Sequence, residues 1–373
     1  MKTRPNDPND RDERPAATRP GELLISLGNR CQYRCQFCAY LKGRNPKVLS
    51  ASAWISLLKD ARNLGFKKLE IGGQGEPALF KGFVRIVHEA RALGFRIKLL
   101  SNIQHKKNIL AILPALSELT VNMNALDEKG FRCLHQPQNP ASFNTAIDNL
   151  ADGARLITEG RSSAFLNISY VVSKTTARSV LLFPKKLWKM LQQRTNIQHP
   201  VYVRFHHILM VPSNYHLCPD SRDLRRMIVA LDKAQDNAFL MAHSNIRDFS
   251  TETKKLLTFY KLWGPFTADS IPGSKKHAAA GKISRHIWCD AAEKILFIDC
   301  DGDAFGCYNP TRTLTGIPAR QDDLYLGNIQ EVPVRTMLRR ASKIGCFHPD
   351  ITRRSWKVCA ACGLRTTWMP PHA

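Results

Sequence analysis

The sequence predicts an α/β protein built around a parallel sheet. Between residues 22 and 208, short apolar strands alternate with amphipathic helices of about a dozen residues, and this alternation implies parallel βαβ units. Chemically reactive motifs stand at the ends of these strands. The pattern favours a partial (β/α)6 barrel, whose active site lies at the carboxyl ends of the strands. Periodicity alone also allows a doubly wound open sheet.

Each predicted element has a local signal. The expected strands, with apolar runs between turn residues, are 22–27, 68–71, 96–100, 119–123, 165–172 and 201–208. The expected helices are 50–64, 83–93, 142–158 and 180–194. The first helix is typical: Ser50 or Ser52 can cap its start, apolar residues recur at helical spacing, and Gly65 can end it.

Composition narrows the class of protein. The chain has 373 residues, 43% of them hydrophobic, which suits a globular fold with a large core. Its 11 cysteines are clustered, and residues 1–20 are polar, rich in proline and unlike a signal peptide, so we expect a disordered leader and a reduced, cytoplasmic chain. No apolar run reaches the 18 or more residues of a membrane helix.

The net charge of +24 comes from Lys and Arg residues spread along the whole chain. A solvated basic surface is therefore favoured, although such a charge can also attract nucleic acid, a phosphorylated substrate or an acidic peptide.

The strongest motif follows the first strand. Residues 28–40, GNRCQYRCQFCAY, place Cys31, Cys35 and Cys38 in a CxxxCxxC array. Such closely spaced thiolates can hold one iron–sulfur cluster, and three ligands for four irons leave one iron open. A structural zinc site is the alternative, but zinc usually takes four ligands.

This array resembles the signature loop of the radical S-adenosylmethionine (radical SAM) enzymes. The resemblance implies that SAM binds the open iron and is cleaved reductively to a 5′-deoxyadenosyl radical. Phe37 fits that family's aromatic position. The resemblance to this family also favours the barrel over the open sheet.

A glycine-rich turn follows the second strand. Residues 72–77 read GGQGEP, and glycines there let the backbone approach a ligand. The turn resembles the family's GGE motif, with Gln74 and Gly75 inserted before the acid. The resemblance implies that Gly72, Gly73, Gly75 and Glu76, through the carboxylate or the backbone, hold the amino group of SAM.

Polar residues mark one face of the fourth strand. Thr120, Asn122 and Asn124 alternate with apolar neighbours and should face the barrel lumen. The resemblance implies that Asn122 and Asn124 contact the SAM ribose. Further candidates for contact with SAM, at similar places on neighbouring strands, are Ser101, Asn102, Asn167 and Ser169. The alternative for each polar residue is a structural role, in which its side chain makes a hydrogen bond within a turn or a helix cap.

The sixth strand carries Tyr202, Arg204 and His206 on one face. A charge aimed into a lumen needs a partner, so Arg204 and His206 are the candidate substrate contacts. A structural salt bridge or hydrogen bond is the competing interpretation.

A second group of cysteines lies near the C-terminus. Cys289 and Cys307 flank a predicted hairpin with strands 294–298 and 304–307, and Cys359 and Cys362 form a CxxC pair. Four thiolates suit either zinc or a [4Fe-4S] cluster. Behind such a core, with LGNI at residues 326–329, the order resembles the SPASM and twitch domains, and a twitch-like domain with one cluster is the better match. Cys300 and Cys346 are spare thiols, either of which could replace a ligand.

The resemblances imply a domain plan. A radical SAM core spans residues 21–215, bridging helices and a loop 216–284, a small α+β twitch-like iron–sulfur domain 285–365, and a tail 366–373. We expect two [4Fe-4S] clusters and SAM as cofactors, with a flavodoxin or ferredoxin as reducing partner.

We expect a radical SAM oxidoreductase that oxidises a small biosynthetic molecule by dehydrogenation or bond formation. Modification of a peptide, or of RNA or a nucleotide, is the alternative. A non-enzymatic iron–sulfur regulator or electron carrier is a remote alternative. Such a protein would not need the glycine turn, so the presence of the turn counts against it.

Overall fold

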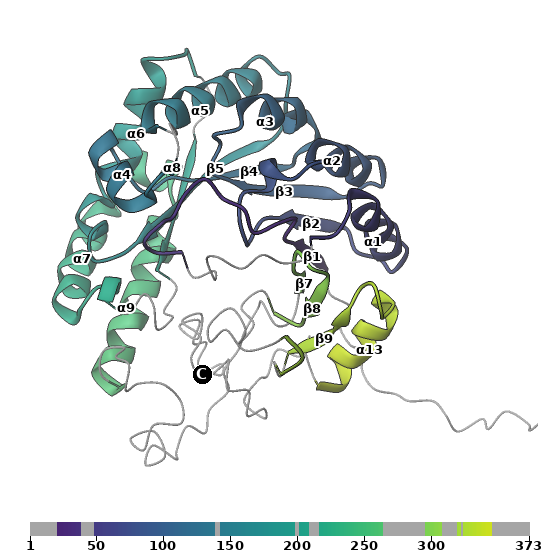
Figure 1. The fold of residues 1–373 in the computed structure, drawn as a ribbon. Coiled ribbons are helices and arrows are strands. Elements are labelled where there is room, and N and C mark those ends of the chain that lie inside the picture. The colour runs from purple at the N-terminus through teal and green to yellow at the C-terminus, as the bar shows by residue number, and fades with distance from the viewer. Residues whose placement is uncertain are drawn as a thin grey trace, which may run out of the picture.

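A curved sheet with helices along its outer side forms the frame of the protein (Figure 1). The computed structural model describes residues 21–38, 48–138, 142–197, 201–208, 216–263, 295–307, 319–321 and 324–344. Within these ranges nine strands form one sheet in the order β6-β5-β4-β3-β2-β1-β7-β8-β9. The strands are β1 Glu22–Ile25, β2 Lys68–Ile71, β3 Arg96–Ser101, β4 Glu118–Asn122, β5 Phe165–Val172, β6 Tyr202–His207, β7 Ile295–Ile298, β8 Asp303–Phe305 and β9 Tyr325–Asn328.

The first six strands pair in parallel and in sequence order. Their order does not reverse, as it would in a doubly wound sheet. The prediction of an α/β partial barrel is therefore confirmed. Two predicted strands, 68–71 and 165–172, have the observed bounds, and the others agree within two residues.

Helices connect these strands. They are α1 Ala51–Asn63, α2 Phe83–Ala92, α3 Lys106–Ile112, α4 Glu128–His135, α5 Phe143–Thr158 and α6 Phe183–Gln192. The Ser50 side chain caps α1 by accepting a 3.2 Å hydrogen bond from the Ala53 amide, and Ser142 caps α5 in the same way. Helices α3 and α4 were not predicted. The fourth predicted helix begins at Phe183 rather than at residue 180, because a short 3-10 turn, Ala177–Ser179, precedes it.

Side chains alternate between two environments along each strand. Ile97 and Leu99 of β3 are fully buried beneath the outer helices, whereas Lys98 between them is only half-buried. Lys98 forms a 2.9 Å salt bridge with Glu70 of β2 on the inner face. At β2 and β3 the inner face of the sheet therefore carries this charged pair, and the main apolar core lies on the outer face.

Within residues 216–263, β6 is followed by helices α7 Ser221–Ala234, α8 Ala238–His243 and α9 Ile246–Trp263. Asn245, at the start of α9, both accepts from the Phe205 amide at 2.7 Å and donates to the Phe205 carbonyl at 2.9 Å. This pairing covers the free edge of β6. None of the helices in the described part of the chain is long and apolar enough to cross a bilayer.

The C-terminal strands extend the core sheet. Strand β7 pairs in parallel with β1, with Leu24 opposite Phe297, and β8 and β9 follow in antiparallel order. Leu24, Phe297 and Phe305 form a second apolar cluster, and helix α13 Val334–Ile344 lies beside β9 (Figure 1). The predicted hairpin is confirmed, but its continuity with the core sheet was not predicted. The proposed domain boundaries stay predictions.

Candidate active site

The cysteine loop lies at the carboxyl end of β1 and is held by the end of α4. The Arg34 amide donates to the His135 carbonyl at 3.0 Å, and the Gln36 amide donates to the Leu134 carbonyl at 2.9 Å. Since these bonds use main-chain atoms, they fix the path of the loop independently of its side chains. The three cysteines are thus presented from one supported turn.

Cys31, Cys35 and Cys38 are all half-buried, and none of them forms a disulfide within the described residues. The Tyr33 amide lies 3.4 Å from the Cys31 sulfur, and the Asn102 side-chain amide lies 3.8 Å from it. Burial, as the largest cause, raises the pKa of Cys31 to about 11, and a bound metal ion reverses such a shift by deprotonating the thiol. N–H groups directed at a sulfur favour a thiolate ligand. The loop therefore fits an iron–sulfur cluster.

No group of three or more His, Cys, Asp or Glu side chains within the described ranges lies close enough to hold a single metal ion. A cubane differs from a single ion, because each thiolate binds a separate iron atom and the sulfurs stand farther apart. The absence of a single-ion site within the described ranges therefore does not count against a cluster at this loop.

The glycine turn packs directly on this loop. Gly75 has φ +71, and a Cβ atom there would lie 2.6 Å from the Gly28 carbonyl oxygen and 2.7 Å from that of Arg30. The next amide, Glu76, donates to the Arg30 carbonyl at 2.8 Å. A side chain at position 75 would therefore displace the cysteine loop. The inserted glycine is what lets the two motifs touch.

Glu76 joins the turn to the end of β3. Its carboxylate accepts hydrogen bonds from the Ser101 hydroxyl at 2.8 Å, the Asn102 amide at 2.7 Å and the Ala78 amide at 3.2 Å. It is 5% exposed, and burial raises its pKa to about 7 although these donors oppose the rise. The structure thus brings together three predicted SAM-binding residues, with most acceptor sites of Glu76 already occupied by the protein itself.

Gln74 connects the turn to the C-terminal strands. The side-chain amide of Gln74 donates to the Asp299 carboxylate at 3.0 Å, and the backbone N–H of Gln74 donates to the Ser26 hydroxyl at 2.8 Å. Asp299 is 1% exposed and follows β7. The residue inserted into the motif therefore links the core to its C-terminal extension.

The polar face of β4 is partly as predicted. Thr120 is buried and Asn122 half-buried on the strand, but Asn124 lies beyond its end. The Asn124 side-chain oxygen accepts from the Val171 amide. This bond leaves its Nδ2 group buried without a hydrogen-bond partner in the part of the chain that the structure describes. An orphaned buried donor beside the cysteine loop suits a bound ligand.

Strand β6 carries the predicted substrate contacts. Arg204 is exposed on the inner face of the sheet, opposite Ser169. It forms no ion pair with any residue that the structure describes. His206 accepts from or donates to the Ser169 hydroxyl at 2.9 Å. Burial lowers the pKa of His206 to about 4, helped by the positive charges of Arg204 and Lys98. Arg204 is therefore not held in a described salt bridge, and His206 is neutral.

The C-terminal ligand set lies mainly outside the described residues. These are Cys289, Cys359 and Cys362, together with the spare Cys346. Cys307 is half-buried just after β8, and Cys300 is buried just after β7. The auxiliary ligand set stays a prediction.

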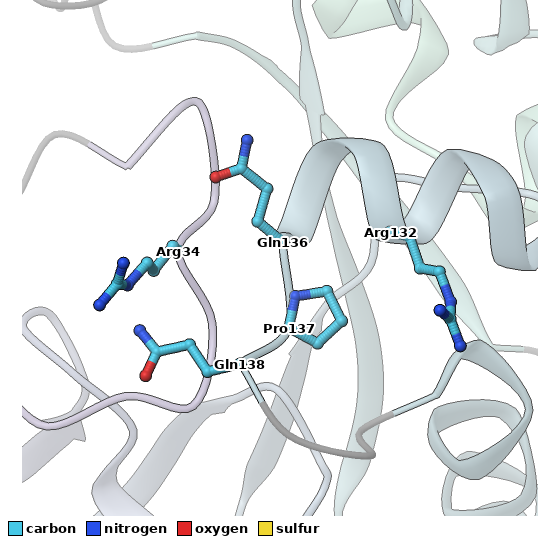
Figure 2. Close-up of a pocket in the computed structure, with 5 residues that line it drawn as sticks. All are labelled: Arg34, Arg132, Gln136, Pro137 and Gln138. Carbon is cyan, nitrogen blue, oxygen red and sulfur yellow. The ribbon is translucent and has the colours of Figure 1, made fainter.

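A cavity of about 610 Å³ opens between the cysteine loop and the end of α4. Figure 2 shows the side chains that line it, Arg34 from the loop, Arg132 from α4, and Gln136, Pro137 and Gln138 beyond the helix. Both arginines are exposed, and Arg132 also pairs with Glu128 at 2.8 Å. This surface beside the cysteines carries two guanidinium groups, and Glu128 balances the charge of one of them.

Sequence reasoning missed His135 and the role of Gln74. His135 is buried at the end of α4, and its Nδ1 atom lies 3.3 Å from the Cys35 sulfur. Its signal is available in the sequence, since Asp127 is a helix cap and Phe131 and His135 share one helix face. The hydrogen bond itself joins residues 100 positions apart.

Comparison with known proteins agrees with these motifs. The model of the radical SAM superfamily matches residues 25–161, and that of the SPASM iron-sulfur cluster-binding domain matches residues 289–363. Curated proteins named PqqA peptide cyclase, from Xanthomonas euvesicatoria pv. vesicatoria (strain 85-10) and Xanthomonas axonopodis pv. citri (strain 306), are each 33% identical over 90 residues. These matches span 22% of this chain and only 23% of each relative.

Solved structures share the fold. SuiB of Streptococcus suis bound to its precursor peptide SuiA gives a TM-score of 0.59 at 16% identity, covering 94% of this chain and 71% of SuiB. The protein anSMEcpe with bound AdoMet and the Cp18Cys peptide gives 0.55 at 17% identity, covering 91% of this chain and 88% of that one.

Both matched families have known cofactors. A radical SAM domain binds a [4Fe-4S] cluster and SAM, and a SPASM domain binds auxiliary iron–sulfur clusters. The two family matches contain the cysteine loop, the glycine turn and the C-terminal cysteines. The chain therefore contains a radical SAM domain, matched over residues 25–161, followed by a SPASM iron–sulfur cluster-binding domain, matched over residues 289–363.

Proposed function

We propose that the protein is an enzyme that modifies a peptide by a net oxidation, such as the formation of a new bond. The observation that carries its chemistry is the direct packing of the glycine turn on the cysteine loop, at the carboxyl ends of β1 and β2. The likeness to proteins named PqqA peptide cyclase supports a peptide better than the small molecule expected from the sequence. The small molecule stays a prediction.

The residues around the loop divide the work of binding the cofactors. Cys31, Cys35 and Cys38 hold the cluster, and the backbone of the glycine turn, beside the Glu76 carboxylate, receives the amino group of SAM. The buried Nδ2 group of Asn124 is left to donate to the same ligand. When bound, the cluster and SAM supply a 5′-deoxyadenosyl radical, which takes a hydrogen atom from the substrate.

The inner face of β5 and β6 receives the substrate. Arg204 is an exposed cation there, and its planar guanidinium suits a carboxylate of the peptide. Ser169 fixes His206 2.9 Å away, and burial keeps that histidine neutral, so it can donate or accept a hydrogen bond without adding charge. These two side chains orient the substrate.

A net oxidation needs an electron acceptor. Loss of a hydrogen atom leaves a substrate radical, and closing a bond at that carbon releases one further electron and one proton. A second cluster held by Cys289, Cys307, Cys359 and Cys362 would be fully ligated and could take that electron. A flavodoxin or ferredoxin would reduce the first cluster, and the basic surface with Arg34 and Arg132 suits such an acidic donor. A cytoplasmic location stays a prediction.

The test uses the full chain, reconstituted anaerobically and supplied with SAM, dithionite and, one at a time, a synthetic peptide for each short open reading frame found beside its gene. We expect 5′-deoxyadenosine to form and the peptide to lose two hydrogen atoms, detected by mass spectrometry. Cys359→Ala should still cleave SAM but form no product. Stimulation of SAM cleavage by a small metabolite and not by the peptide would contradict the peptide assignment. Product formation at the normal rate by Cys359→Ala would contradict the electron-accepting role.

A further inference from the structure

A buried histidine contacts one of the three cysteines of the loop. His135 is the last residue of α4 and is 0% exposed. Its Nδ1 atom lies 3.3 Å from the sulfur of Cys35, within hydrogen-bond range for a sulfur acceptor. Neither the sequence motifs nor the proposed function uses this residue. A buried imidazole directed at a ligand sulfur therefore needs an account of its own.

The other ring nitrogen fixes where the proton sits. The backbone N–H of Asn124 donates to Nε2 of His135 at 3.3 Å. An amide N–H can only donate, so Nε2 must be the unprotonated acceptor, and the proton of a neutral imidazole is then on Nδ1. Nδ1–H therefore donates to the sulfur of Cys35.

Aromatic rings hold the imidazole in this orientation. The ring centroids of Phe131, Tyr33 and Phe37 lie 4.7, 5.4 and 5.6 Å from that of His135. The main chain of His135 also accepts the Arg34 amide at 3.0 Å, which ties it to the cysteine loop. The donor therefore cannot turn away from Cys35 without disturbing the loop, and the rings keep water from replacing it.

We propose that His135 is a positioning residue that donates an N–H···S hydrogen bond to Cys35 in the SAM-binding cluster and raises the reduction potential of that cluster. This inference rests on the proposed function, in which Cys35 is a cluster ligand. Reduction adds negative charge that spreads onto the ligand sulfurs, and an N–H dipole directed at a sulfur stabilises that charge. Hydrogen bonds to the sulfurs are among the features that set the potential of an iron–sulfur cluster.

The first experiment compares His135→Phe with His135→Asn in the full chain, reconstituted anaerobically. Phenylalanine keeps a planar ring but has no N–H, whereas the asparagine amide can place an N–H near the position of Nδ1. The midpoint potential is measured by redox titration of the EPR signal that changes when SAM is added, which separates this cluster from any auxiliary one. His88→Phe, on the exposed side of α2, is the matched control.

For His135→Phe we expect the reduced-to-oxidised ratio at a fixed potential to fall about tenfold, a shift of about 59 mV for one electron. His135→Asn should restore part of this shift, and His88→Phe should show none. A purely structural role would change the amount of cluster bound without this ordered change in potential. Equal potentials in the wild type and His135→Phe would overturn the inference.

A second measurement does not depend on any variant folding. Wild-type protein grown with ¹⁵N-histidine should show a ¹⁵N coupling in pulsed EPR of the reduced, SAM-responsive cluster. Absence of that coupling would overturn the inference.

Cys35→Ala distinguishes a failure of the hydrogen-bond inference from a failure of the proposed function. Loss of the SAM-responsive cluster in this variant supports the proposed function whatever His135 does. A cluster that survives the change would show that Cys35 is no ligand and would overturn both.

Discussion

The two ends of the candidate site differ in how far the protein satisfies its own polar groups. Near β1 to β3, the buried Glu76 carboxylate accepts three hydrogen bonds from the protein. Near β5 and β6, Arg204 is exposed and has no ion pair in the described part of the chain, and His206 bonds to Ser169. The cofactor end is therefore largely preorganised by the fold, with the Nδ2 group of Asn124 left for a ligand, whereas the substrate end keeps a charged side chain available. Substitutions at the first end should disturb the fold, and those at the second should change recognition.

Gly75→Ala gives the largest expected effect, because it breaks the preorganised end. The new Cβ would meet the Gly28 carbonyl oxygen at 2.6 Å and displace the cysteine loop. We expect SAM cleavage to slow by about a hundredfold, the size of effect that a misplacement of about 1 Å can produce. The measurements are iron content and 5′-deoxyadenosine formation.

Gly160→Ala is the matched control for that change. Gly160 has φ +70, almost the same backbone strain, but nothing lies within 4 Å of its Cβ position. It should lose some stability and keep full activity. Equal losses of activity in the two variants would mean that strain, and not contact with the cysteine loop, explains Gly75.

Arg204→Gln tests the open end and should have an intermediate effect. Loss of a charged hydrogen bond costs about 1.5–3 kcal/mol, so we expect KM for the substrate to rise roughly 10- to 100-fold. SAM cleavage without substrate and the stability of the fold should not change.

Arg204→Lys keeps the charge but loses the planar guanidinium, and it should recover only part of the substrate binding. Arg161→Gln, on an exposed loop before β5, serves as control. Unchanged KM in Arg204→Gln would remove β6 from the substrate site.

The smallest expected effect is a pH dependence from His206. Its pKa is lowered from 6.5 to about 4, so the folded state favours the neutral ring. This contribution to stability is complete above pH 6.5 and is lost as the pH falls from 6.5 toward 4. This contribution is at most about 3 kcal/mol and less in practice, because His206 is partly exposed.

The test is urea unfolding at pH 7 and at pH 5. The difference in stability between the two pH values should be smaller in His206→Gln than in the wild type. The pKa of His207 is lowered chiefly by burial and also by the charge of His206, so both profiles are repeated in a His207→Gln background. Parallel pH profiles would contradict the assignment.

Local patterns predicted the barrel well, because each strand and cap depends on neighbouring residues. The alternation of Tyr202, Arg204 and His206 with buried Val203 and Phe205 follows from the two-residue period of a strand. The Ser50 and Ser142 caps follow from side chains that accept a hydrogen bond from an amide three residues later.

The remaining features depend on contacts between distant residues. The hydrogen bond between Gln74 and Asp299 joins positions 225 residues apart, and that between Cys35 and His135 joins positions 100 apart. No periodicity encodes such contacts. The glycine turn shows the limit clearly: its sequence suggested a ligand site, but only the backbone of the cysteine loop shows why position 75 must be glycine.

The pairing of β7 with β1 has a consequence for how the chain is made. Strand β1 leaves the ribosome before its partner β7, which begins about 270 residues later. At synthesis rates of about 5–20 residues per second, one edge of β1 stays unpaired for roughly 15–50 s. A free strand edge is a template for wrong pairing. A nascent chain that stalls or is cut before β7 would keep that edge open and would be prone to aggregate, so the C-terminal extension completes the barrel core as well as carrying the second group of cysteines.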